Sequence, residues 1–175
     1  TLTGANLAGV NMEDTQLADA RFEYTIPNDE NVLPEDIAPE AILAGADLSE
    51  ADLTGACLFD ATLVDADLRG ANLSGAELAA ATLVGADLTD ANLTNMRFTN
   101  ANLSDADLTN ADLTGADLAD AYLSNTNLTG ATLTSTKPTD LSNAYLTRAD
   151  LDGADLSDAD LRGADIYGAN LDNVT

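Results

Sequence analysis

The chain has 175 residues, with 31 acidic and 6 basic side chains, no histidine and one cysteine. A net charge of −25 disfavours direct nucleic-acid binding, and the missing histidine excludes His-based triads, bases and metal ligands. One cysteine excludes an internal disulfide, and no apolar run is long enough to span a membrane. Aromatic content is only 4%, but 45% of residues are hydrophobic and fall in a regular pattern, which argues against disorder.

A five-residue unit recurs along most of the chain: a small residue, a polar residue, a leucine and two further polar positions. Ala46-Asp47-Leu48-Ser49-Glu50 is one such unit, and the repeat is unbroken over residues 41–135. Ala and Leu two positions apart lie on one face of an extended segment, so we expect both inside. All 12 glycines lie two residues after the central apolar residue, in a column otherwise rich in Asp and Asn. These residues tolerate positive φ, which predicts a tight turn in every unit.

On these units the chain resembles the pentapeptide-repeat proteins, whose motif is A(D/N)LXX. The resemblance covers most of the chain. It implies an all-β fold, a right-handed quadrilateral parallel β-helix with four pentapeptides per coil. With coils about 4.8 Å apart, we expect about eight coils in a rod on the order of 37 Å long. Residues 1–175 are therefore predicted to form a single solenoid domain.

Two segments interrupt the count of five. Residues 23–40 contain three of the four prolines and many acids. Pro34 and the two acids after it are typical of a first helical turn, so we predict a loop with a short helix over 34–41; a disordered insertion is the alternative. The second break, between Leu133 and Leu141, predicts a three-residue bulge within 134–138. Residues stacked on one face are then found by adding 20, or 23 across the bulge.

This register stacks carboxylates along one face. The predicted acidic ladder consists of Asp47, Asp67, Asp87, Asp107 and Asp150, with Asn127 between the last two. Like charges one strand spacing apart are expected to raise some of the carboxyl pKa values or to attract cations. The ladder is interpreted as a solvated face that blocks aggregation, as a mimic of a phosphate backbone, or as a low-affinity Ca²⁺ site. A straight ladder diverges, whereas Ca²⁺ needs converging oxygens, so we expect no metal and no cofactor.

A neighbouring surface is predicted to consist of uncharged side chains. The candidate interaction surface consists of Ile42, Phe59, Thr62, Val64, Ala79, Thr82 and Val84. On so acidic a chain, these side chains suggest a surface for a protein partner or for self-association. The alternative interpretation is ordinary β-propensity on a face exposed to solvent.

A further predicted ladder contains Cys57, Glu77, Arg97 and Asp117, in which Arg97 is expected to bridge the acids above and below. Acidic neighbours make a lone thiol less nucleophilic, so Cys57 is not a candidate nucleophile. Carboxylate pairs occur throughout the chain, so their presence does not indicate a glycosidase. We therefore expect no enzymatic activity and no small-molecule substrate.

The sequence favours a non-enzymatic β-helical scaffold or protein-interaction module. The alternative, implied by resemblance to the quinolone-resistance branch of the family, is an acidic DNA mimic that binds a type II topoisomerase. Members of that branch are acidic rods that dimerise through a C-terminal element and use projecting loops. This chain shares the acidity and one long loop, but repeats continue to Leu171 with no dimerising helix.

The ends and the compartment are less well determined. Thr1 already lies within a repeat, so we expect a processed or trimmed piece of a longer chain. Apolar residues near both ends have no visible cap, which predicts contacts between copies or missing flanking sequence. The sequence does not identify the compartment; a bacterial cytoplasm is favoured over a periplasm or a thylakoid lumen.

Overall fold

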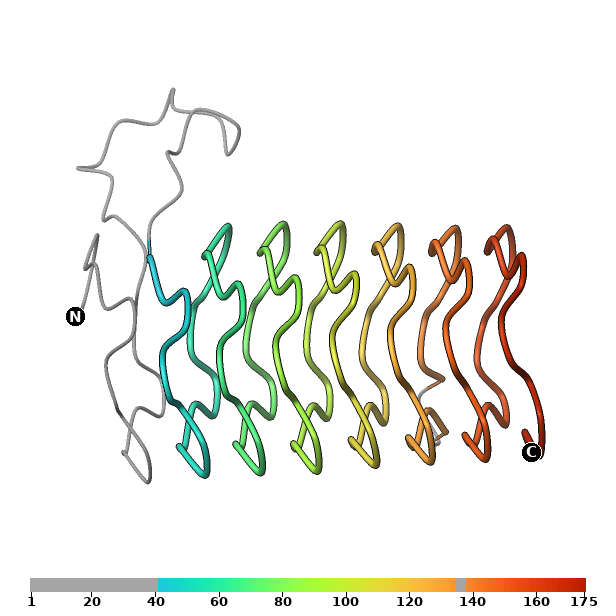
Figure 1. The fold of residues 1–175 in the computed structure, drawn as a ribbon, viewed down its shortest axis with the longest axis horizontal. Helices are drawn as coiled ribbons and strands as arrows, with labels where there is room; N and C mark the ends of the chain where they lie inside the picture. The colour runs from blue at the N-terminus through green and yellow to red at the C-terminus, as the bar shows by residue number, and fades with distance from the viewer. Residues whose placement is uncertain (1–40, 135–137) are drawn as a thin grey trace.

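The computed structural model describes residues 41–134 and 138–175, so the predicted insertion 23–40 and its helix lie outside the described residues. The described residues form a stack of coils along one long axis (Figure 1). Within these two ranges there is no continuous helix or strand. Neighbouring coils are joined by isolated parallel bridges, such as Ile42↔Thr62 and Asp47↔Asp67. The backbone is therefore a β-solenoid in which each short extended segment alternates with a turn.

The bridges give the period of the coil. They join residues 20 apart as far as Asp112↔Thr132, and residues 23 apart where the pairing spans the undescribed 135–137, as in Tyr122↔Tyr145. Four pentapeptides therefore make one coil, and the predicted change of register from 20 to 23 is confirmed. The right hand of the coil and the total of about eight coils stay predictions.

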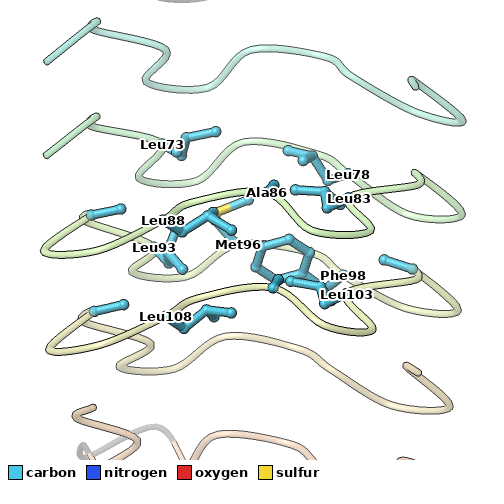
Figure 2. Packing of buried hydrophobic residues seen from close by; sticks show 14 of the residues in the cluster. Leu73, Leu78, Leu83, Ala86, Leu88, Leu93, Met96, Phe98, Leu103 and Leu108 are labelled. Carbon is cyan, nitrogen blue, oxygen red and sulfur yellow. The ribbon is translucent and has the colours of Figure 1, made fainter. Parts of the chain in front are cut away.

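The interior contains the side chains that the repeat predicts. Central apolar residues from Leu43 to Leu151 are at most 1% exposed, and the alanines two residues before them are also buried. Figure 2 shows these side chains filling the space between the walls of the coils. Burying one leucine contributes roughly 1.5–3 kcal/mol, so each coil adds a similar increment of stability. In the last coil, Leu161, Ile166 and Leu171 are 36%, 46% and 44% exposed.

The turn column behaves as its composition predicts. Every residue two positions after a central residue in the described ranges has positive φ, between 54° and 78°. Glycine, asparagine and aspartate account for most of these positions, because they adopt this conformation at little cost. Ala80, with φ of 60°, is an exception whose Cβ makes the conformation unfavourable by about 1–2 kcal/mol.

The hydrogen bonds of one pentapeptide account for four of its five backbone N–H groups. The N–H of Leu43 and that of Gly45 donate to the next coil, to the carbonyls of Thr62 and Val64, at 2.7 and 2.8 Å. The N–H of Ala46 closes the turn by donating to Leu43 at 3.0 Å. A residue in the position of Thr62 donates back to the preceding coil, at 2.8 Å. The N–H of the residue directly after the central leucine takes no part in this backbone network.

Candidate interaction faces

The remaining N–H explains why the second position of the repeat is so often Asp or Asn. The N–H of Thr54 donates to the Asp52 carboxylate at 3.1 Å, and that of Ser74 donates to the Asn72 side-chain oxygen at 3.2 Å. The same contact recurs along the rod, for example from Thr114 to Asp112 at 3.0 Å. The side chain two residues earlier thus caps an N–H that the coil leaves unused. Much of the acidity of the chain is therefore a structural feature of the repeat.

These caps also favour the ionised carboxylate. The Thr54 hydroxyl and N–H lower the pKa of Asp52, and those of Ser157 lower the pKa of Asp155. The Arg162 side chain and N–H lower the pKa of Asp160 in the same way. Hydrogen bonds to the charged form stabilise that form relative to the neutral acid.

The predicted acidic ladder is present in the structure. Parallel bridges connect its members on successive coils; in order these are Asp47, Asp67, Asp87, Asp107, Asn127 and Asp150. Amides separate some of the charges, since Asn127 Nδ2 donates to Asp107 Oδ1 at 3.2 Å and Asn170 Nδ2 donates to Asp150 Oδ1 at 2.9 Å. The ladder is thus less repulsive than a column of bare carboxylates.

Arg69 further neutralises the ladder, and sequence reasoning missed it. Its Nη2 lies 2.5 Å from Asp67 Oδ2, and its Nε lies 3.8 Å from Asp87 Oδ2. The hydrogen bonds from Arg69 lower the pKa of Asp67. Asp67 is therefore not one of the carboxyls whose pKa the ladder raises, because the Arg69 cation and one backbone N–H outweigh the neighbouring carboxylates. The signal was available, since Arg69 lies two residues after a ladder position.

The second predicted ladder is also present, joining Cys57, Glu77, Arg97 and Asp117 by parallel bridges. Arg97 Nη1 lies 3.8 Å from Glu77 Oε1. In the described ranges no ion pair joins Arg97 to Asp117, so the expected bridge forms on one side only. The Arg97 side chain is 63% exposed, and exposed pairs of this kind contribute about 0–1 kcal/mol.

The candidate interaction surface falls on two faces. Ile42, Thr62 and Thr82 form one ladder, and Val64 and Val84 lie beside them on the same face. Phe59 and Ala79 belong to the preceding face, across the corner formed by the turn residues Asp60 and Ala80. Burial raises the pKa of Asp60 at that corner. Except for Ile42, which is 41% exposed, the seven side chains are half-buried.

The same face continues over more coils than the sequence prediction included. We name it the uncharged face and define it by its outward residues: Ile42, Ala44, Thr62, Val64, Thr82, Val84, Asn102, Ser104, Tyr122, Ser124, Tyr145 and Thr147. None of these side chains carries a charge, although the chain has 31 acids. Adding 20 or 23 to the numbers of the predicted residues gives every later member, so the register predicts how far this face extends.

The uncharged face also lacks most of the caps. At its second position it has Ile, Thr or Tyr, and within the described residues the N–H groups of Val64, Val84, Ser124 and Thr147 have no hydrogen-bond partner. Asn102 is the exception and caps the N–H of Ser104 at 3.1 Å. A net hydrogen bond contributes about 0.5–1.5 kcal/mol, so this face lacks a stabilising contact that the repeat supplies elsewhere.

Two tyrosines project from the C-terminal part of the uncharged face. The rings of Tyr122 and Tyr145 stack, with centroids 5.0 Å apart and planes at 6°. They are 47% and 45% exposed. The stack forms because the two residues, 23 positions apart, are bridge partners on adjacent coils.

Metal-ligating side chains do not cluster in the part of the chain that the structure describes. Among them, no group of three or more His, Cys, Asp or Glu side chains converges on a point where an ion would sit. No helix within the described ranges has the length and apolar character needed to cross a bilayer.

A coil of four pentapeptides, with Ala and Leu inside and Asp or Asn capping, defines a class of repeat solenoids. The family model for pentapeptide repeats matches in eight copies, over residues 1–26, 40–70, 56–95, 97–134 and 139–175. The chain belongs to the pentapeptide repeat family.

Several solved structures resemble the chain. HetL, a pentapeptide repeat protein involved in heterocyst differentiation regulation in Nostoc sp. strain PCC 7120, is 28% identical; the match covers 98% of this chain and 89% of HetL, with a TM-score of 0.48. Rfr23 from Cyanothece 51142 is 31% identical, covering 98% and 88%, with a TM-score of 0.20. QnrB1, a plasmid-mediated fluoroquinolone resistance protein, is 20% identical, covering 97% and 71%, with a TM-score of 0.48. No curated protein matches the chain.

Proposed function

We propose that the protein is a non-enzymatic scaffold, a right-handed quadrilateral β-helix of about eight coils that uses its uncharged face to dock a protein partner. A bacterial cytoplasmic setting is part of this proposal. The observation that carries it is that this face departs twice from what the repeat favours. It excludes charge, and it replaces capping Asp or Asn with Ile, Thr and Tyr. Neither departure stabilises the coil, which supports selection for contact.

The distribution of charge supports the same role. The neighbouring face carries the acidic ladder from Asp47 to Asp150, so the uncharged face is bordered by carboxylates. A partner that covers this face therefore contacts an uncharged strip of Ile, Val, Thr and Tyr side chains with a row of carboxylates along one edge. Apolar contact supplies affinity, and the charged edge supplies orientation and a faster encounter.

The test is a double substitution, Val64→Lys with Val84→Lys. Two ammonium groups on the strip are expected to abolish partner capture or self-association while leaving the coil folded, because both side chains point outward. Capture from extracts of the source cells and light scattering measure the effect. Thr99→Lys with Ala119→Lys, on adjacent coils of another face, is the matched control. Unchanged capture and unchanged oligomeric state in Val64→Lys/Val84→Lys would remove the proposal.

The alternative function, a DNA mimic that binds a type II topoisomerase, is favoured by the overall charge density. A net charge of −25 over a rod on the order of 37 Å is roughly one charge per 1.5 Å. Duplex DNA carries one per about 1.7 Å. A gyrase supercoiling assay separates the two functions: protection or inhibition at low micromolar protein supports mimicry, and no effect supports the scaffold.

A further inference from the structure

Tyrosines are concentrated at one end of the uncharged face. The chain has four tyrosines in all. Tyr122 and Tyr145 stack on this face, and Tyr167 lies on the next coil, 75% exposed. Tyr167 lies on the same side of the rod, since its carbonyl accepts the Arg148 N–H at 2.9 Å. Three of the four tyrosines thus lie together on a protein that is only 4% aromatic.

Tyr122 and Tyr145 remain largely exposed although their rings stack. Aromatic rings normally contribute by burying large apolar areas, yet almost half of each ring here is open to water. Thr62 and Thr82 occupy the same column on earlier coils, so the fold does not need an aromatic residue there. Exposed rings at a position that tolerates threonine indicate a contact that the isolated chain does not make.

A carboxylate lies directly beyond the stack. Asp165 is the bridge partner of Tyr145 on the following coil. Its Oδ1 accepts the N–H of Tyr167 at 3.0 Å, and its Oδ2 accepts the Thr147 hydroxyl at 3.4 Å. These two bonds fix the orientation of the carboxylate on the coil that follows Tyr145. The first charged residue in the column that runs from Ile42 through Tyr122 and Tyr145 is therefore an anion, one coil beyond an exposed tyrosine.

We propose that Tyr122, Tyr145 and Asp165 form a recognition site for an arginine side chain in a basic segment of a protein partner. The guanidinium plane stacks on the outer face of Tyr145 and donates to Asp165. Arginine fits better than lysine, because its planar fork both stacks on a ring and pairs with a carboxylate. This inference rests on the proposed docking function and specifies its partner.

Charge complementarity selects this occupant over a second copy of the chain. A copy carrying a net charge of −25 would bring its own acidic ladder toward Asp165, and like charges brought together oppose association. A basic segment instead gains from the negative field of the whole rod, which speeds its encounter with the site. An uncharged sugar would gain nothing from that field.

The test is calorimetric titration with a capped hexa-arginine peptide at about 0.15 M salt, where long-range attraction is screened. Tyr122→Thr with Tyr145→Thr uses the residue found at Thr62 and Thr82, so the fold is expected to tolerate it. It should weaken binding about 3-fold or more and reduce the preference for hexa-arginine over hexa-lysine, since one exposed cation–π contact is worth roughly 2- to 5-fold.

Asp165→Asn and Asp155→Asn provide the matched pair. Both residues cap an N–H, at 3.0 Å in each case, and asparagine keeps that cap while removing one charge. Asp165→Asn should weaken arginine binding about 3-fold, and Asp155→Asn should leave it close to the wild-type value. Equal losses in the two variants, or wild-type affinity in Tyr122→Thr/Tyr145→Thr, would overturn the arginine site. The docking function would still stand if Val64→Lys/Val84→Lys abolished partner capture.

Discussion

Replacing Leu103 with aspartate is expected to unfold the coils around it. Leu103 is fully buried, and its N–H and the carbonyl before it hold the coil to both neighbours. The substitution removes a buried leucine, which alone costs about 2–5 kcal/mol. It also buries a carboxylate with no partner, which adds several kcal/mol more. Urea unfolding followed by circular dichroism should find no cooperative transition, or one destabilised by more than about 4 kcal/mol.

The adjacent residue supplies the control. Asn102 lies one position earlier, points outward and caps the N–H of Ser104 at 3.1 Å. Aspartate has the same acceptor, so Asn102→Asp is expected to change the free energy of unfolding by no more than about 0.5 kcal/mol. Two acidic substitutions one residue apart thus differ only in the side of the wall that they face. Similar stabilities for the two variants would contradict the assignment of inside and outside.

Phe98→Ala is expected to cost about 3–5 kcal/mol, since Phe98 is the largest fully buried side chain in the described ranges. It lies in the same unit as Met96, which replaces the usual alanine (Figure 2). The larger pair stretches the corner: the Met96 N–H lies 3.4 Å from the Leu93 carbonyl, whereas alanines in this position usually lie at 2.8–3.1 Å. Backbone hydrogen bonds join this segment to both neighbouring coils, so we expect that it cannot collapse around an alanine.

Phe98→Leu, the residue found in the same column at Leu78 and Leu118, separates volume from chemistry. It is expected to cost less than about 1.5 kcal/mol in the same urea titration, because most of the volume is retained. If Phe98→Ala and Phe98→Leu were equally stable, the interior at this coil would not be close-packed, contrary to the burial of both residues in the unit.

The architecture was predictable because every pentapeptide repeats the same inward, outward and turn positions. The sequence positions predict the inward Ala and Leu columns, the positive-φ column and the 23-residue pairing across residues 135–137. The stack of Tyr122 on Tyr145 confirms that step most clearly, since any other register separates the two rings. The insertion 23–40 and its helix lie outside the described residues and stay predictions.

The role of the acids was less predictable. Sequence reasoning treated each Asp as a charge facing its neighbours, whereas the coordinates reveal it as a hydrogen-bond acceptor for one backbone N–H. Which N–H the coil leaves unused depends on the hydrogen bonds between coils, and the repeat pattern does not specify these. Thr62 and Thr82 are uncharged, and they also leave the N–H two residues later, that of Val64 or Val84, without a side-chain cap.

Thr82→Asn tests most directly whether the residues of the uncharged face lower the stability of the coil, as expected if they serve contact with a partner instead. Asparagine at this position would cap the N–H of Val84 without adding charge, as Asn92 does for Thr94 at 3.1 Å. The account predicts that the free energy of unfolding in urea rises by about 0.5–1.5 kcal/mol. A variant that is no more stable than the wild-type chain, or less stable, would contradict it.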